Sequence, residues 1–509
     1  MRCWRLAILA LLFGCLPLAC GPVPEPASDQ PVEVAVLFFN DIHGHLLPFN
    51  VKLPDGTRGE VGGIARLASL IRGIASDNHR RGGKTVTLIA GDILQGTPMS
   101  TVFKGKPDVE IFNAIAVDAM TVGNHEFDFG LDNFLELKKL ARFPFLSANV
   151  VWKESGEPLC DGAVSIPLAP DLHLTVIGVT TTELLTTTKP SNVERIAVKD
   201  PVPIVKDLYG KHGPKGPVIL LSHSKADTDE EIARAVPGLT AIIGGHDQIL
   251  LNPRKLVGPV PVFQAFEKGR FLGVLRLLVA RSAKTALLTD WVYLPVTPDL
   301  TEDPEVAERV ESYRARLDSQ FKEVVGTCET YLDGERGRIR YEETNLGNFV
   351  TDIMREYTNA EIALLNAGSL RASLDEGPIT LEAIFNVMPY ENELCRVEVT
   401  GEELLRILAR GMSGSREDED GGFLHVSGLT LRVRDGKVRD VLVGGAGVDP
   451  ARTYTVAITD FMASGGDGYD ILKAKPAVKT GSPLRDLIVD TIRSRKTVSA
   501  KTEGRIVRD

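Results

Sequence analysis

Short apolar runs that end in metal-binding or acid–base side chains recur along the first half of this 509-residue chain. Helix-like stretches separate most of these runs, and this alternation predicts an α/β fold. The polar groups that follow the runs are Asp41-Ile42-His43, Gly91-Asp92, Gly123-Asn124-His125, Ser222-His223 and Gly244-Gly245-His246-Asp247-Gln248. Because strand ends converge at one edge of an α/β sheet, groups about 200 residues apart are expected to meet there.

The predicted elements of this half follow from the apolar patterning. Strands are predicted at residues 34–39, 85–89, 119–122, 174–179, 218–221 and 239–243. Helices are predicted at residues 64–74 and 134–140.

The stretch Gly123-Asn124-His125-Glu126-Phe127-Asp128 carries the densest group of polar side chains. Glycine permits the sharp exit of the backbone from the strand before it. The grouping makes chemical sense if Asn124 binds a metal, His125 faces a substrate and Asp128 orients the imidazole ring.

Composition limits the classes of protein that this chain can belong to. Hydrophobic residues make up 43% and charged residues 25%, which is typical of a globular protein, and the length favours two or three domains. The formal net charge of −10 argues against a protein that coats polymeric nucleic acid. Small phosphorylated substrates stay compatible with this charge, because a bound metal can set the local field.

Residues 1–20 predict a leader for export. Arg2 and Arg5 form a basic segment, and the apolar run 6–13 after them is too short to span a bilayer. Cys15 and Cys20 each follow a lipobox-like segment, and Cys20 is favoured as the acylated residue because a Pro-rich tether, 21–31, starts directly after it. A lipid-anchored protein of a bacterial envelope, periplasmic or at the cell surface, is therefore expected, with a plain secretory protein as the alternative.

Cysteine usage directs any metal to nitrogen and oxygen ligands. Only Cys160, Cys328 and Cys395 follow the leader, which excludes a disulfide framework and disfavours a thiolate zinc site. Ligands from His, Asp, Asn and Gln suit zinc, manganese, cobalt or iron(II). Two such cations about 3.5–4 Å apart can hold a phosphoryl group and activate water. With Asp92 as the bridging carboxylate, the other candidate ligands form two sets, Asp41, His43 and Gln248, and Asn124, His223 and His246.

In order and spacing, these motifs resemble the calcineurin-like metallophosphoesterases, and more narrowly the 5'-nucleotidase / UDP-sugar hydrolase / 2',3'-cyclic phosphodiesterase family. The last motif ends in Gln248, as in the periplasmic nucleotidases of that group. The resemblance implies a layered α/β sandwich with two divalent ions (Mn, Zn or Co) on the seven residues named above. It also implies that His125 and Asp128 form a dyad that stabilises the transition state.

A second domain is predicted after a proline-bounded boundary. The loop-like segment 295–304 contains three prolines and leads into a charged, helix-patterned segment, 305–322. The predicted organisation is a metallophosphoesterase domain at 32–295, a linker with a helix at 296–324, and a smaller α/β substrate-binding domain at 325–509.

The motifs of the second domain also resemble the C-terminal domain of these nucleotidases. The resemblance assigns Arg371, after Asn366-Ala367-Gly368, to the phosphate or the terminal group of the substrate, since guanidinium suits bidentate oxyanion contacts. It assigns Phe423 and Phe461 to a nucleobase clamp and Asp467 to the ribose hydroxyls, with Asn366 and Gly368 as further pocket residues. The family's additional arginine is either Arg410 or Arg416, and the acidic stretch 417–420 beside them departs from the family pattern.

The leading interpretation is an exported hydrolase of nucleoside 5'-monophosphates, with UDP-sugars and 2',3'-cyclic nucleotides as further candidate substrates. One alternative is a thiosulfohydrolase of sulfur oxidation on the same fold, which would have no use for Phe423, Phe461 and Asp467. The other alternative is a non-catalytic surface binding protein, which the complete set of metal and dyad residues disfavours.

Overall fold

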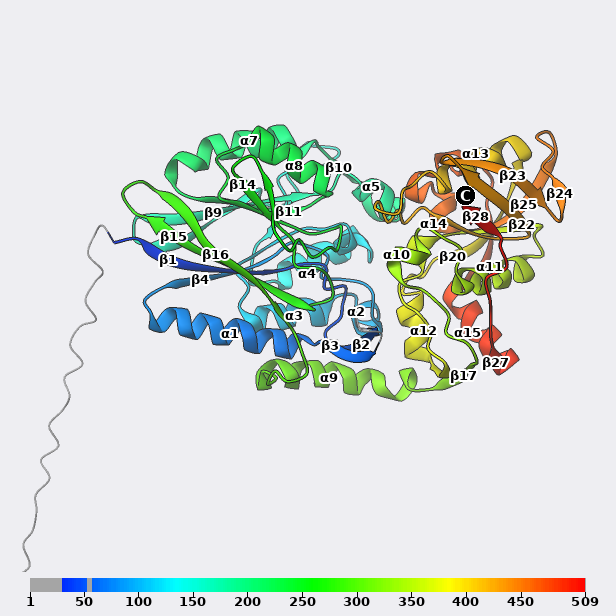
Figure 1. Ribbon diagram of the computed structural model, residues 1–509, viewed down its shortest axis with the longest axis horizontal. Helices are drawn as coiled ribbons and strands as arrows, with labels where there is room; N and C mark the ends of the chain where they lie inside the picture. Colours follow the sequence, from blue (N-terminus) through cyan, green and yellow to red (C-terminus); the bar gives the residue numbers. More distant parts are fainter. Residues whose placement is uncertain (1–29, 53–56, 509) are drawn as a thin grey trace, which may run out of the picture.

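The computed structural model describes residues 30–52 and 57–508. The predicted leader, both candidate acylation sites and nearly all of the tether lie outside the described residues. Two α/β domains are visible, and helix α9 (Pro304–Phe321) runs along the first domain towards the second (Figure 1). The predicted two-domain α/β fold is confirmed. Within the described residues, no helix combines the length and apolar character needed to cross a membrane.

Two six-stranded sheets form the centre of the N-terminal domain, and each contains four adjacent parallel strands. In the first sheet an antiparallel hairpin extends one side, and in the second an antiparallel strand lies at each edge. The first sheet has the order β16 (Thr285–Pro295), β15 (Phe271–Ala280), β1 (Val32–Phe39), β4 (Lys84–Ile89), β5 (Ala119–Thr121) and β6 (Phe145–Leu146). The second has the order β13 (Lys255–Val257), β14 (Val260–Phe263), β12 (Ala241–Gly244), β11 (Val218–His223), β9 (Leu172–Thr180) and β8 (Ala163–Ala169).

The two sheets pack face to face, with helices on the outside. Fully buried side chains such as Phe38, Leu221 and Phe263 fill the layer between the sheets, and their removal from water stabilises the domain by roughly 1.5–3 kcal/mol per side chain. Helices α1 (Ile64–Arg80), α3 (Lys106–Ile115) and α4 (Leu131–Leu140) pack on the first sheet, and α9 packs on the outer side of α1 and α3. Helices α7 (Pro201–His212) and α8 (Ala226–Ala235) pack on the second sheet. This is the layered sandwich that the sequence predicts.

The C-terminal domain is built on one five-stranded sheet with the order β21 (Leu424–Ser427), β18 (Ile362–Asn366), β25 (Thr453–Thr459), β20 (Glu393–Thr400) and β26 (Val478–Pro483). One face carries α11 (Asn345–Thr358), α12 (Leu381–Val387) and α15 (Leu484–Arg495). The other face carries α13 (Gly401–Gly411) and a small sheet of β22 (Leu429–Arg434), β23 (Lys437–Val443), β24 (Ala446–Gly447) and β28 (Ile506–Arg508).

Shorter elements connect these layers. They are β2 (Pro48–Lys52), β3 (Arg58–Gly62), α2 (Pro98–Val102), β7 (Val150–Trp152), α5 (Leu184–Thr187), α6 (Pro190–Val193), β10 (Ile196–Val198), β17 (Val324–Cys328), α10 (Arg336–Ile339), β19 (Gly377–Thr380), α14 (Asp460–Ala463) and β27 (Thr497–Val498).

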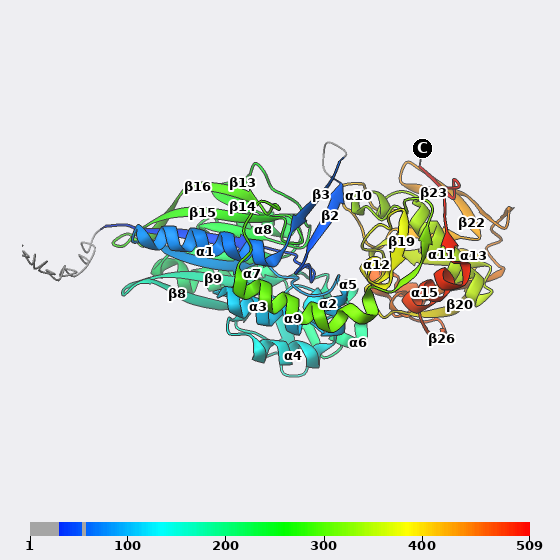
Figure 2. The ribbon, with the colours of Figure 1, turned by 90° about the horizontal axis from the view of Figure 1, so that it is seen from below.

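The two domains touch along the edge where the central strands of the first domain end. The β2–β3 hairpin extends towards the second domain (Figure 2), and Arg58 forms an ion pair with Asp375 at 2.6 Å. Lys189, at the start of α6, forms an ion pair with Asp460 at 2.7 Å. The loops at the strand ends are therefore enclosed between the domains.

Candidate active site

The candidate metal ligands lie on loops that leave the carboxyl ends of the parallel strands. Asp41 and His43 follow β1, Asp92 follows β4 and Asn124 follows β5, whereas His223 ends β11 and both His246 and Gln248 follow β12. Five of these seven residues have a positive backbone φ: Asp41 (51°), His43 (48°), Asp92 (53°), His246 (74°) and Gln248 (58°). Non-glycine residues rarely adopt this region, and such strain persists where the surrounding structure enforces it, typically at functional sites.

Asp92 is the centre of this group, as expected for a bridging ligand. Its Oδ1 accepts a hydrogen bond from the backbone N–H of His125 at 2.9 Å, and its Oδ2 lies 3.1 Å from Nε2 of His223. Gly123 makes this approach feasible, because a Cβ at that position would lie 2.2 Å from Oδ1 of Asp92. Burial opposes charge on both partners, but their attraction outweighs it, so that the pKa of Asp92 falls and the pKa of His223 rises to about 10.

The tautomer of His223 leaves one nitrogen available for a cation. Its Nδ1 donates to the carbonyl of Ala90 at 2.7 Å, and its buried Nε2 faces Oδ2 of Asp92 at 3.1 Å. The raised pKa keeps a proton on Nε2 when no metal is bound, and release of that proton would leave Nε2 and the Asp92 carboxylate as two neighbouring ligands for a divalent cation.

His246 is oriented by an acidic residue that the sequence did not single out. Its Nε2 lies 3.0 Å from Oε2 of Glu183, and its Nδ1 lies 3.1 Å from Oδ1 of Asn124. Lys225 holds the other oxygen of Glu183 at 2.8 Å. Burial raises the pKa of Glu183, but the hydrogen bonds and charges of His246 and Lys225 outweigh it and lower the pKa to about 2. This carboxylate fixes Nδ1 as the nitrogen available to a metal.

The remaining set is formed by Asp41, His43 and Gln248. Oδ2 of Asp41 accepts from the Asn40 amide at 2.7 Å and from the backbone N–H of His246 at 3.0 Å, whereas the buried Oδ1 has no hydrogen-bond partner among the residues that the structure describes. Nε2 of His43 lies 3.7 Å from that Oδ1 and 2.6 Å from the side-chain amide of Gln248. Burial, and to a lesser extent the charge of Asp92, raises the pKa of Asp41 to about 6 against the attraction of His223.

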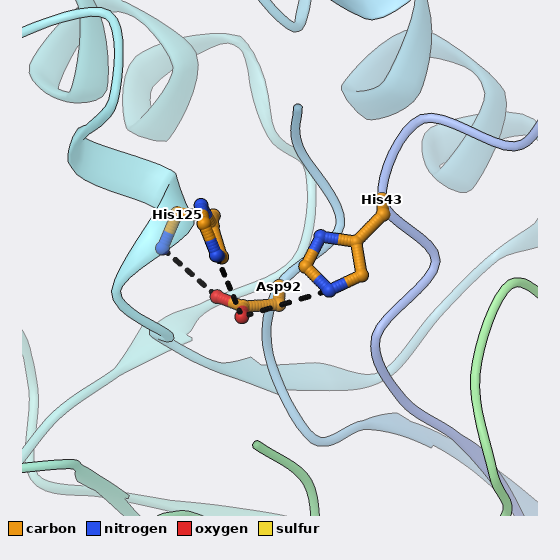
Figure 3. A group of neighbouring side chains, drawn as sticks. All are labelled: His43, Asp92 and His125. Carbon is orange, nitrogen blue, oxygen red and sulfur yellow. Dashed lines mark hydrogen bonds and ion pairs between the residues drawn. The ribbon is translucent and has the colours of Figure 1, made fainter. Parts of the chain in front are cut away.

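These residues fit two divalent cations that share one carboxylate. Potential ligand atoms form two groups, and within each group they all lie within 4.8 Å of one another. The first group is His43, Asp92 and His125 (Figure 3), and the second is Asp92, His223 and His246. Asp92 is common to both groups. Oδ1 of Asp41, which has no hydrogen-bond partner among the described residues, and Nε2 of His223, once deprotonated, are further potential ligand atoms in the same volume. All the donors are nitrogen or oxygen, which suits the metals expected from the sequence.

His125 and Asp128 form the pair that the sequence predicts. Nδ1 of His125 lies 2.5 Å from Oδ2 of Asp128, and Nε2 lies 3.9 Å from Oδ2 of Asp92. Burial alone would lower the pKa of His125, but the charges of Asp128 and Asp92 raise it above its ordinary value. With Nδ1 engaged, Nε2 is the atom that can donate a proton towards the cavity.

A cavity of about 500 Å³ between the domains connects this group to the predicted substrate residues. Asn366, Gly368, Arg371, Phe461 and Asp467 line it, opposite Asp92, Asn124, His125, Asp128, His246 and Gln248. Asp467 accepts a hydrogen bond from the Asn366 amide at 2.7 Å, and burial raises its pKa to about 6. Among the described residues, Arg371 has no ion pair or hydrogen bond from its guanidinium, which is therefore available to an anion.

Phe423 is placed differently from its predicted partner Phe461. Only 2% of Phe423 is exposed, and its ring packs edge-on against His425 at 5.4 Å between centroids, outside the residues that line the cavity. The structure thus brings one of the two predicted aromatic residues to the cavity, and the clamp stays a prediction.

Two further arginines, which the sequence motifs did not identify, line the cavity. Arg336 donates through Nη1 to Oε1 of Gln248 at 2.6 Å, and Arg340 is a half-buried cavity residue. Their signal in the sequence is three arginines at alternate positions, Arg336-Gly337-Arg338-Ile339-Arg340, directly before α11. Of the two candidates left open, Arg410 lines the cavity and pairs with Asp420 at 2.6 Å, whereas Arg416 is exposed and pairs with Glu342.

Comparisons with known proteins agree with this geometry. Residues 34–249 match the calcineurin-like phosphoesterase family, and residues 324–474 match the 5'-nucleotidase, C-terminal domain family. Protein UshA of Escherichia coli (strain K12) is 28% identical over 533 residues, covering 94% of each chain. The crystal structure of a 5'-nucleotidase precursor from Thermus thermophilus has a TM-score of 0.85 at 29% identity and covers 94% of this chain and 99% of that one.

The chain belongs to the calcineurin-like phosphoesterases that carry a 5'-nucleotidase C-terminal domain. It is a phosphoester hydrolase of the 5'-nucleotidase and UshA type, and phosphoesterases of the calcineurin-like class use divalent metals. The sulfate thiohydrolase SoxB of Thermus thermophilus also has this fold, with a TM-score of 0.77 over 93% of this chain and 96% of SoxB. At 20% identity, that likeness shows the shared fold alone.

Proposed function

We propose that the protein is an exported, lipid-anchored hydrolase of nucleoside 5'-monophosphates that uses two divalent cations bridged by Asp92. We include UDP-sugars and 2',3'-cyclic nucleotides as further candidate substrates of the enzyme. The observation that carries it is a single cavity lined by metal-binding groups on one side and by Arg371, Phe461 and Asp467 on the other.

The cations would bind Asp41, His43, Asp92, Asn124, His223, His246 and Gln248, and when bound they would supply a nucleophile from water at neutral pH and charge to stabilise the phosphoryl group. Arg371 would hold the phosphate oxygens through its guanidinium, which has no partner among the described residues. His125, kept protonated by Asp128, would donate from Nε2 to the phosphoryl or leaving-group oxygen. Asp467 would accept hydrogen bonds from ribose hydroxyls, and Phe461 would contact the base.

The test is hydrolysis of AMP, UDP-glucose and 2',3'-cyclic AMP by apoprotein restored with manganese, zinc or cobalt. A simple aryl phosphate serves as the control, because it requires the metals but no nucleoside contacts. Metal-dependent release of phosphate from AMP, with a kcat/KM well above that for the aryl phosphate, supports the proposal. Aryl phosphate cleavage without cleavage of any nucleotide would contradict it.

Export and lipid attachment need a separate test. Metabolic labelling with a palmitate analogue should mark the wild-type protein and the Cys15→Ala variant, and Cys20→Ala should lose the label. Loss of label in Cys15→Ala alone would move the anchor to Cys15, and an unlabelled wild-type protein would contradict the lipid anchor.

A further inference from the structure

Glu419, in the acidic stretch 417–420, contacts two of the arginines that line the cavity. Its Oε2 accepts a hydrogen bond from Nε of Arg336 at 2.5 Å, and its backbone carbonyl accepts one from Nη1 of Arg340 at 2.9 Å. Glu419 itself lines the cavity. Arg336 also donates to the candidate metal ligand Gln248. Glu419 is therefore linked through Arg336 to the metal-ligand side of the cavity.

The backbone at Glu419 is in an unfavourable conformation. Its φ is 42°, a region that a glutamate adopts at an energetic cost. Both contacts to arginine come from this one residue, one through the side chain and one through the carbonyl. In this conformation the backbone of Glu419 places both its carboxylate and its carbonyl against arginines of the cavity wall.

The arginines of the cavity are not equally available to an anionic substrate. Arg371 carries no ion pair among the described residues, whereas Arg336 is paired with Glu419. Arg340 lies further along the cavity, near enough to Asp467 for its charge to oppose the effect of burial on the pKa of that carboxyl. Arg336 reaches the metal-ligand end of the cavity through Gln248, whereas the charge of Arg340 acts on Asp467. Glu419 contacts both arginines and therefore lies on the cavity wall that joins these two ends, where a second phosphoryl group between the metals and the ribose would meet it.

We propose that Glu419 is a specificity-determining residue that discriminates against substrates with a second phosphoryl group, a role that rests on the nucleotide hydrolysis proposed above. In a monophosphate, the single phosphoryl group is held by the metals and Arg371, and no further phosphoryl group extends along the wall that carries Glu419. In a nucleoside diphosphate or a nucleotide sugar, the additional phosphoryl group must displace this carboxylate from Arg336 or lie next to it. Like charges at short distance repel, and solvent at the half-buried pair screens only part of that repulsion.

The decisive variant is Glu419→Gln, which removes the charge and keeps a hydrogen-bond acceptor for Arg336. The kcat/KM for ADP and for UDP-glucose should rise about tenfold, whereas the value for AMP should change less than threefold. Glu419→Asp retains the charge and should retain the discrimination. Glu417→Gln is the matched control, because Glu417 lies in the same stretch, is exposed and is not among the cavity residues.

A second measurement separates this inference from the proposed function. Inorganic phosphate and pyrophosphate are tested as inhibitors of aryl phosphate hydrolysis, and Glu419→Gln should lower the Ki of pyrophosphate relative to phosphate about tenfold. If the wild-type enzyme cleaves no nucleotide, the proposed function fails, while this ratio still decides the role of Glu419. An unchanged ratio, or an equal fall in activity on AMP, ADP and aryl phosphate, would overturn the inference. Should Glu419→Gln not fold, Glu419→Asn is the substitute, since Asn is better tolerated at positive φ.

Discussion

The contacts of His125 are compatible with two roles, metal binding and proton transfer. Its Nε2 lies near the Asp92 carboxylate within a potential metal group, whereas its Nδ1 is engaged by Asp128. The pairing with Asp128 favours proton transfer, because it holds the ring in one orientation and keeps its pKa raised against the effect of burial.

His125→Ala is therefore expected to lower kcat by roughly 10²–10⁴ while leaving metal content unchanged. Steady-state kinetics and elemental analysis of the same preparation check both parts. Loss of metal together with activity would identify His125 as a ligand instead.

A second residue, Asp108 at the start of α3, bears on stability. It is fully buried, and burial raises its pKa from 3.8 to about 8. The folded state therefore keeps a proton that the unfolded chain releases above pH 3.8, so this residue's contribution to stability falls as the pH rises towards 8.

Asp108→Asn should remove this dependence. Between pH 5 and pH 8, the wild-type free energy of unfolding is expected to fall by about 3–4 kcal/mol more than that of the variant. Denaturant titrations at the two pH values give the difference. Asp229, whose pKa burial also raises to about 8, is present in both proteins and cancels. Equal pH dependence of the two proteins would show that Asp108 is already ionised in the folded state.

At the scale of elements, the strand-end loops were predictable because each one combines a buried apolar run with polar residues directly after it. Strands β1, β4, β9 and β11 lie within two residues of their predicted ends, and helix α9 matches the predicted segment 305–322. Helix α1 continues to Arg80. The prediction ended this helix at residue 74, because the apolar pattern of the sequence is weak after that point. The β15–β16 hairpin and the small sheet of the C-terminal domain were not predicted. Strands β16 and β23 are largely exposed or half-buried, so no buried apolar run marks them in the sequence.

Site residues whose role depends on tertiary contacts were the ones the sequence did not reveal. Glu183 follows β9 in a threonine-rich stretch, and only the approach of β12 brings His246 to it. Arg336 acquires its position from a contact between domains, which no local pattern encodes. Phe423 is the opposite case, because a sequence motif identified the residue but its ring packs against His425 and does not line the cavity.

The loop between β9 and α5 yields a prediction of its own, because Glu183 orients His246 from this loop. Glu183→Ala should weaken the affinity for the cation at His246 by 10–100-fold, about the usual effect of removing such a carboxylate. Glu183→Gln is the control, since its amide oxygen can still accept from Nε2 of His246 and should preserve most of the affinity. Calorimetric titration of metal into apoprotein measures both variants. Equal losses in the two would indicate that charge, and not orientation of the ring, is what Glu183 supplies.

At the scale of the molecule, neither domain holds all the residues of the site. The candidate metal ligands belong to the first domain, whereas Arg371 and Asp467 belong to the second, and the cavity between the domains contains both groups. Helix α9 runs from one domain to the other, so a change at its ends would move the substrate residues relative to the metals (Figure 1). The contacts that hold the domains together should therefore affect nucleotide turnover.

Lys189 and Asp460 offer the sharpest test of this dependence. Asp460 is almost fully buried and accepts from Lys189 of the other domain and from the backbone N–H of Glu393, so removal of Lys189 leaves a buried charge with one partner fewer. Lys189→Met should lower kcat/KM for AMP about fivefold, roughly 1 kcal/mol, and increase the radius of gyration in X-ray scattering, while Lys199→Met, an exposed lysine of the same domain, should do neither. Since Lys189 also lines the cavity, a double-mutant cycle with Asp460→Asn separates the two roles. If the ion pair is the cause, the double variant should lose no more than Lys189→Met alone, whereas additive losses would mean that Lys189 acts on the substrate directly and that domain contact does not limit turnover.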